Sequence, residues 1–112
     1  MYPKYDDTHA PLLCEIARRG GSCRPSERVN GLTVYEVLAH HFQLSPEAQQ
    51  RQFTLISGPN QNRAQWLWPY RVRWAKDQLQ RLGLLESPAR GIWALTDRGW
   101  QAVRRLNGEN AR

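Results

Sequence analysis

Residues 65–81, which read QWLWPYRVRWAKDQLQR, alternate aromatic and cationic side chains in a way suited to nucleic-acid chemistry. Three tryptophans and a tyrosine fall within nine residues, and they are Trp66, Trp68, Tyr70 and Trp74. Four cations accompany them, and these are Arg71, Arg73, Lys76 and Arg81. Guanidinium groups bind phosphates and guanine edges, whereas an aromatic face offers apolar surface to a methyl group in the major groove. The stretch therefore predicts contact with nucleic acid.

Helical periodicity sorts these side chains onto two faces. At ~100° per residue, an apolar stripe of Val72, Ala75, Leu79 and Leu82 predicts a helix from about Pro69, with Gly83 at its end. The opposite face carries Tyr70, Arg73, Trp74, Asp77 and Arg81, and the stripe is flanked by Arg71 and Lys76. In a helix-turn-helix, such a helix enters the major groove. We expect Arg73 at a guanine edge and Arg71, Lys76 and Arg81 at phosphates.

The surrounding elements predict how this helix is held. Earlier helices are expected from Thr8 to about Arg19, from Thr33 with Glu36 in a capping box, and from Ser45 to about Gln52. The residues FTLISGPNQNRAQ are expected to be extended and then a loop. After Gly83, LLES and GIWALT form a predicted hairpin with Arg90 at its tip. A last helix, capped by Thr96, turns Trp100, Val103 and Leu106 inward. This order predicts a mostly α-helical winged helix-turn-helix with a small β-hairpin.

The five tryptophans are predicted to divide between core and interface. Trp93 and Trp100 are expected in the core, and Trp74 suits either place. For Trp66 and Trp68, packing and ligand contact both stay open, since tryptophan is more often buried than not. We predict a modified-base pocket of Trp66, Trp68 and Tyr70. The N6-methyl of adenine and the C5-methyl of cytosine both project into the major groove. An extruded base stacked between aromatics, or an ordinary thymine methyl, are the alternatives.

Composition narrows the classes of function. A formal net charge of +6, from 16 Lys and Arg against 10 Asp and Glu, indicates a polyanionic partner. No apolar run approaches the ~18 residues of a membrane span, and the first residues do not resemble a signal peptide, so we expect a cytoplasmic chain. The candidate metal ligands are His9, Cys14, Cys23, His40 and His41, whose spacing matches no zinc pattern. We expect no metal, no cofactor and no catalytic site.

The residues YRVRWAKDQLQRLGLLESPARGIWALTDRGWQAV resemble the N-terminal domain of Mrr-type restriction proteins. The matching positions are Arg71, Val72, Trp74, Ala75, Gly83, Leu84, Leu85, Arg90, Gly91, Trp93, Leu95, Thr96 and Gly99. The segments HAPLLCEIARRGG and SPEAQQRQ are also similar to that family. Tyr70 stands where the family usually has asparagine, after the unusual segment of residues 66–69, and this is where specificity for a modified base is expected.

The resemblance implies a winged-helix domain that targets a nuclease to methylated DNA. We accordingly expect residues 1–112 to be one monomeric domain that binds double-stranded DNA for a larger modification-dependent restriction endonuclease. The resemblance favours N6-methyladenine, for example in GATC, over 5-methylcytosine. A winged-helix regulator that reads unmodified DNA is the runner-up, although it would need a dimerising element. A winged helix that binds only protein is a third hypothesis.

Overall fold

The structure is a computed structural model that describes residues 2–59 and 61–108. The helices are α1 (Tyr5–Arg18), α2 (Val34–His41), α3 (Pro46–Gln49), α4 (Leu67–Arg81) and α5 (Asp97–Leu106). The strands are β1 (Ser22–Cys23), β2 (Gln52–Thr54), β3 (Ala64–Trp66), β4 (Leu85–Glu86) and β5 (Trp93–Leu95). The chain is therefore mostly α-helical with two small antiparallel sheets, as predicted.

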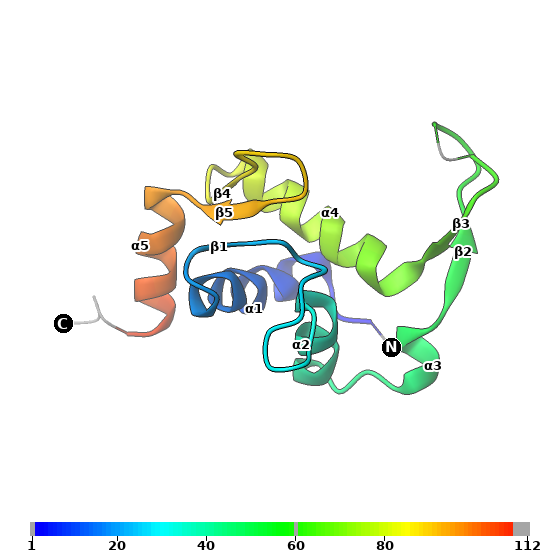
Figure 1. The fold of residues 1–112 in the computed structure, drawn as a ribbon, viewed down its shortest axis with the longest axis horizontal. Helices are drawn as coiled ribbons and strands as arrows, with labels where there is room; N and C mark the ends of the chain where they lie inside the picture. The colour runs from blue at the N-terminus through cyan, green and yellow to red at the C-terminus, as the bar shows by residue number, and fades with distance from the viewer. Residues whose placement is uncertain (1, 60, 109–112) are drawn as a thin grey trace.

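The arrangement is a winged helix (Figure 1). Helices α2 and α4 pack on α1, and α4 is followed by the hairpin of β4 and β5, which is the wing. β1 pairs with β5 on the side away from β4, so the sheet order is β1-β5-β4. Strand β1 was not predicted from the sequence, because a two-residue strand in a polar loop has no periodicity of its own.

Apolar side chains from three helices form the core. The largest fully buried ones are Leu12, Ile16, Val34, Leu38, Val72 and Leu79. They come from α1, α2 and α4, so the outer surface of α4 is fixed by the stripe that faces α1. Helix α2 begins at the predicted capping box, in which Thr33 Oγ1 accepts from the Glu36 backbone N–H at 3.2 Å and Glu36 Oε1 accepts from the Thr33 N–H at 2.9 Å.

Helix α1 starts three residues before the predicted cap. It begins at Tyr5, and Thr8 lies inside the helix, where its hydroxyl donates to the Lys4 carbonyl oxygen at 3.0 Å. Asp6 and Asp7 occupy the first turn, where acids suit the helix dipole. Pro11 consequently lies within the helix and not in its first turn.

The junction between α4 and α5 gives a structural reason for Thr96 and Gly99, two of the positions that carry the resemblance described above. Thr96 Oγ1 donates to the Gly83 carbonyl oxygen at 2.6 Å and accepts from the Gly99 N–H at 3.1 Å, so the threonine both caps α5 and holds the end of α4. A Cβ at Gly99 would collide with the carbonyl oxygen of Leu84. Gly83 itself has φ of 78°, a conformation that favours glycine at a helix end. The Thr-x-x-Gly spacing is thus a structural junction.

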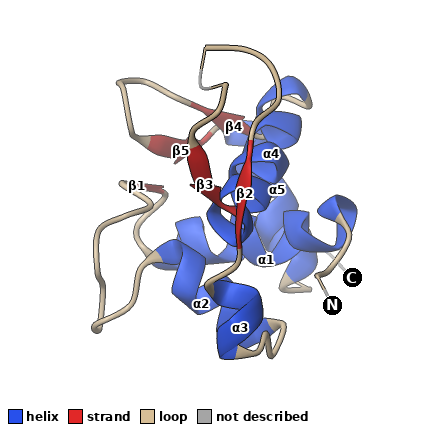
Figure 2. Ribbon diagram, turned by 90° about the vertical axis from the view of Figure 1, so that its right-hand side faces the viewer, coloured by secondary structure: helices blue, strands red, loops and turns tan. Residues whose placement is uncertain are grey.

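A second hairpin, which we call the arm (residues 52–59 and 61–66), precedes α4 and was not predicted. Its strands pair Gln52 with Trp66, Phe53 with Gln65 and Thr54 with Ala64. The predicted extended run is therefore one strand of a hairpin, and α3 ends at Gln49, earlier than expected. The arm extends away from the rest of the chain beside the first turn of α4 (Figures 1 and 2).

Two apolar positions that were predicted to face inward do not. Leu82 lies just past the end of α4 and Leu106 in the last turn of α5, and each is at least half exposed. Trp93 and Val103 are buried as expected, and Trp100 is half-buried against the core. Helix ends fray from the core, so the periodic stripe overstates burial there.

Candidate nucleic-acid interface

The outer face of α4 gathers several of the residues that the sequence predicted for contact with DNA. A shallow depression on it is lined by Tyr70, Arg73, Trp74, Lys76 and Asp77. Trp74 is 37% exposed, so its indole is partly available to a partner. Arg81 is exposed one turn farther along the same helix. The predicted aromatic and cationic face therefore exists as one surface.

A row of aromatic rings joins this face to the arm. The Tyr70 ring lies 6.2 Å from the Trp74 ring and 4.8 Å from the Phe53 ring, centroid to centroid, and both pairs meet edge to face. Such pairs contribute about 0.5–1.5 kcal/mol beyond the area they bury. Tyr70 is thus half-buried between the arm and α4. It is not grouped with Trp66 and Trp68, so the predicted trio does not form a single pocket.

Arg71, for which a phosphate contact was predicted, contacts the N-terminal segment of the chain. Its Nη2 donates to the Pro3 carbonyl oxygen at 2.7 Å, and its guanidinium carbon lies 4.6 Å from the centroid of the Tyr5 ring and 5.3 Å from that of Tyr2. These contacts place the guanidinium on the α1 side of α4, away from Arg73. The sequence did not indicate these contacts, because a residue beside an apolar stripe can turn toward either face of the helix.

Trp68 is a core residue, so its expected role in contacting DNA does not fit this geometry. It is 2% exposed and stacks on Tyr2 with ring centroids 6.1 Å apart. Its indole N–H donates to the Tyr35 carbonyl oxygen at 2.8 Å. A buried tryptophan usually has such a partner for its N–H. No periodic signal in the sequence distinguished Trp68 from Trp66.

The remaining predicted cations differ in how available they are. Lys76 Nζ lies 2.7 Å from an Asp77 carboxylate oxygen and 5.7 Å from the centroid of the Trp93 ring, so its charge is partly neutralised. Arg90 is exposed in the loop of the wing. Arg81 and Arg90 therefore suit phosphate contact better than Lys76.

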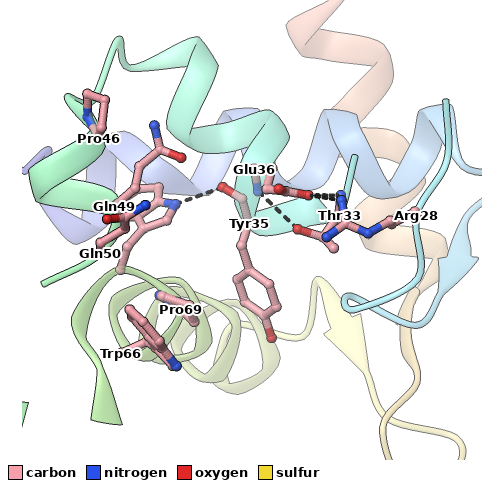
Figure 3. Close-up of a pocket in the computed structure, with 10 residues that line it drawn as sticks. Arg28, Thr33, Tyr35, Glu36, Pro46, Gln49, Gln50, Trp66 and Pro69 are labelled. Atoms are coloured by element: carbon pink, nitrogen blue, oxygen red, sulfur yellow. Dashed lines mark hydrogen bonds and ion pairs between the residues drawn. The ribbon is translucent and has the colours of Figure 1, made fainter. Parts of the chain in front are cut away.

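A cavity of about 760 Å³ opens between α2, α3 and the start of α4 (Figure 3). Its lining residues are Arg28, Thr33, Tyr35, Glu36, Pro46, Gln49, Gln50, Trp66, Trp68 and Pro69. Trp66, which is 50% exposed, lies beside Pro69 at the α4 end, and Gln49 and Gln50 come from α3 and the residue after it. The cavity therefore combines aromatic surface with side-chain amides, a combination that suits a nucleobase.

Charge is arranged unevenly around this cavity. Burial raises the pKa of the Tyr35 phenol, and the Arg73 guanidinium opposes that shift, so the phenol stays neutral and lies near a cation of the α4 face. At the opposite rim, the Thr33 backbone N–H, helped by Arg28, holds the pKa of Glu36 below its usual value. Arg28 Nη1 lies 2.9 Å from Glu36 Oε1. Tyr35 and Arg73 thus connect the cavity to the outer face of α4.

Cys14 and Cys23 are free thiols, and burial raises the pKa of both, which disfavours the nucleophilic thiolate. Among residues 2–59 and 61–108, no three His, Cys, Asp or Glu side chains are grouped as metal ligands would be. Over the same residues, no helix combines the length and apolarity needed to cross a membrane.

Comparison with known proteins identifies the family. Neither the curated proteins nor the solved structures contain a match to the chain. The family model of the Mrr N-terminal domain, in contrast, matches residues 10–105, which include every helix from the middle of α1 to nearly the end of α5. The chain therefore belongs to the Mrr N-terminal domain family.

Proposed function

We propose that this domain binds double-stranded DNA, with α4 in the major groove and the wing against the backbone. The observation that carries the proposal is the outer face of α4, where Arg73, Trp74 and Arg81 stand exposed or half-exposed on one surface. A recognition helix of a winged helix presents such a face to base edges and phosphates. The net charge of +6 supports the same partner.

We further propose that the domain reads methylated DNA and that the cavity between α2, α3 and α4 holds the modified base. Trp66 and Tyr35 supply aromatic surface for the methyl group and the ring, and the amides of Gln49 and Gln50 suit the hydrogen-bonding edge of adenine. Because the cavity lies beside the outer face of α4, a base that enters it leaves the stack, as in enzymes that flip bases. This arrangement supports N6-methyladenine as the preferred mark.

Membership of the Mrr N-terminal domain family supports a role in restriction. We propose that the domain serves as the targeting part of a modification-dependent endonuclease whose catalytic residues lie in another domain. In that role the domain supplies recognition alone, as one DNA-binding unit in the cytoplasm.

A reader of unmodified sequence is the second candidate, because Arg73 and Trp74 on α4 suit a guanine edge and a thymine methyl. Fluorescence anisotropy separates the candidates when one labelled duplex is offered unmodified, with N6-methyladenine in GATC, or with 5-methylcytosine in CG. Tight binding to the adenine-methylated duplex supports the proposal. Preference for the duplex with 5-methylcytosine would identify that base as the recognised modification. Equal affinity for all three duplexes would favour the second candidate. A chain that binds none of them would contradict both.

A further inference from the structure

The arm carries the most exposed large apolar side chain among the described residues. Ile56, in the loop between β2 and β3, is 87% exposed. One exposed isoleucine on a surface needs no explanation. Ile56, however, lies two residues past the end of β2, in the loop of a hairpin that extends away from the core (Figures 1 and 2), and its exposure shows that it has no packing role.

The positive charge around the arm favours a polyanion as its partner. From Ala48 to Lys76 the sequence contains no Asp or Glu in 29 residues, whereas it contains five cations. Arg51 immediately precedes the arm and Arg63 lies within it, and both are exposed. An acid-free arm with exposed arginines suits the uniformly negative phosphate backbone of DNA.

The arm is fixed to the recognition helix. Phe53 packs edge to face on Tyr70 at 4.8 Å between ring centroids, and the Leu67 N–H donates to the Arg51 carbonyl oxygen at 2.9 Å. Any docking of α4 in a groove therefore carries the arm with it. The loops of the arm and of the wing extend toward the same side of the molecule in both views, at opposite ends of α4 (Figures 1 and 2).

The dimensions suit contact with two minor grooves. Helix α4 has 15 residues, about 22 Å at 1.5 Å per residue. The two minor grooves on either side of one major groove lie about 34 Å apart along the duplex. Along the longest dimension of the molecule, which is 49 Å, the arm lies toward one end and α5 toward the other, with the wing between them (Figure 1). Because the arm projects from the N-terminal end of α4 and the wing from the C-terminal end, the arm lies nearer the minor groove that the wing does not contact.

We propose that the arm is a second DNA-contacting element that places Ile56 in the minor groove beyond the N-terminal end of α4. Arg51 and Arg63 would hold the flanking phosphates, and the isoleucine would act as an apolar wedge that partly unstacks a base step and bends the duplex. This inference rests on the proposed binding of double-stranded DNA. It adds a contact that neither α4 nor the wing provides.

The test uses the 112-residue chain and a 30-base-pair duplex with one central GATC, either unmodified or N6-methylated on both strands. Hydroxyl-radical footprinting reads the minor groove, and energy transfer between dyes on the two duplex ends reads the bend. We expect the wild-type chain to protect a minor groove on each side of the site. Ile56→Ser should lose one of these protections, reduce the bend and weaken binding about tenfold. The double variant Arg51→Ala, Arg63→Ala should lower the salt slope by about 1.8.

Matched controls lie on α5, at the opposite end of the molecule (Figure 1). Leu106→Ser removes another exposed apolar side chain, and Arg104→Ala with Arg105→Ala removes two exposed cations. These variants should leave the protection on the arm side and the bend unchanged, and thermal unfolding should confirm that Ile56→Ser is folded. If wild-type chain binds neither duplex, the proposed function and the arm are both wrong. If it binds, and Ile56→Ser matches it in footprint, bend and affinity, the arm alone is wrong.

Discussion

The indole N–H of Trp68 donates a 2.8 Å hydrogen bond to the backbone carbonyl oxygen of Tyr35. This bond ties the first turn of α4 to the first turn of α2 at the base of the cavity. Trp66, two residues earlier, lies at the mouth of the same cavity and is half exposed. The two tryptophans therefore have different roles. Trp68 holds together the helices that form the cavity, and Trp66 lines its open side.

Trp68→Ala should destabilise the fold by about 3–5 kcal/mol, the usual cost of truncating a buried tryptophan. Trp66→Ala should cost less than about 1 kcal/mol, since half of its surface already contacts water. Urea denaturation followed by circular dichroism measures both free energies of unfolding. Equal costs for the two variants would show that Trp68 is not the structural residue of the pair.

Substitutions of Arg71 and Arg73 should have different effects, the first on the stability of the fold and the second on DNA binding. Arg71→Ala should lower the free energy of unfolding by about 2 kcal/mol, because it removes a charged hydrogen bond and two cation–π contacts. Arg73→Ala should leave stability within about 0.5 kcal/mol and weaken DNA binding by about 1–3 kcal/mol. Denaturation and anisotropy on the same two proteins test the difference. If Arg71→Ala is folded and loses as much DNA affinity as Arg73→Ala, Arg71 contacts DNA and its role is not only structural.

Glu15 should make the stability of the domain depend on pH. Its carboxylate is buried, which raises its pKa, but hydrogen bonds and charges from Arg18 and Arg19 outweigh burial and lower the pKa. A lowered pKa in the folded state means that the ionised form stabilises the fold at neutral pH, and that this stability is lost as pH falls through the folded pKa.

Glu15→Gln should therefore cost about 3 kcal/mol at pH 7, since it also leaves the Arg19 side chain buried without its partner at 2.7 Å. The gap between wild type and variant should narrow as the pH falls from 5 toward 3. Urea denaturation at a series of pH values measures it. A gap that stayed constant over this range would contradict the assignment.

Arg90→Ala in the wing should weaken binding to methylated and unmodified duplex alike and lower the salt slope by about 0.9. Lys76→Ala should lower it by less, because Asp77 already neutralises part of that charge. Anisotropy at several salt concentrations gives both slopes. A sequence-dependent loss for Arg90→Ala would place that side chain at a base and not at a phosphate.

The elements with their own local signals were predictable. Three helix starts were predicted from their capping residues, which are Thr33 with Glu36, Ser45 with Pro46, and Thr96. The structure confirms each cap. The wing and the inward stripe of α4 were also predicted. Caps and periodic stripes depend on neighbours in sequence, which is why one chain suffices to find them.

The parts that were missed depend on contacts between distant segments. Arg71 turns toward Pro3 and Tyr5, and Trp68 bonds to Tyr35, in each case across more than 30 residues. The cavity joins the starts of α2 and α4 with α3, so no stretch of sequence shows it. The arm was missed because strands of three residues around a Gly-Pro loop carry little alternation. These features depend on tertiary contacts, which override the preferences of the local sequence.

The central claim is that Trp66 and the cavity beside it read the methyl group. The most direct test is the ratio of dissociation constants for unmodified and N6-methylated GATC duplexes, measured for wild type, Trp66→Ala and the control Trp74→Ala, whose indole lies on α4 outside the cavity. We predict a ratio of about ten or more for wild type, a ratio near one for Trp66→Ala, and weaker binding with an unchanged ratio for Trp74→Ala. A wild-type ratio of one, or a ratio that Trp66→Ala leaves intact, would contradict the claim.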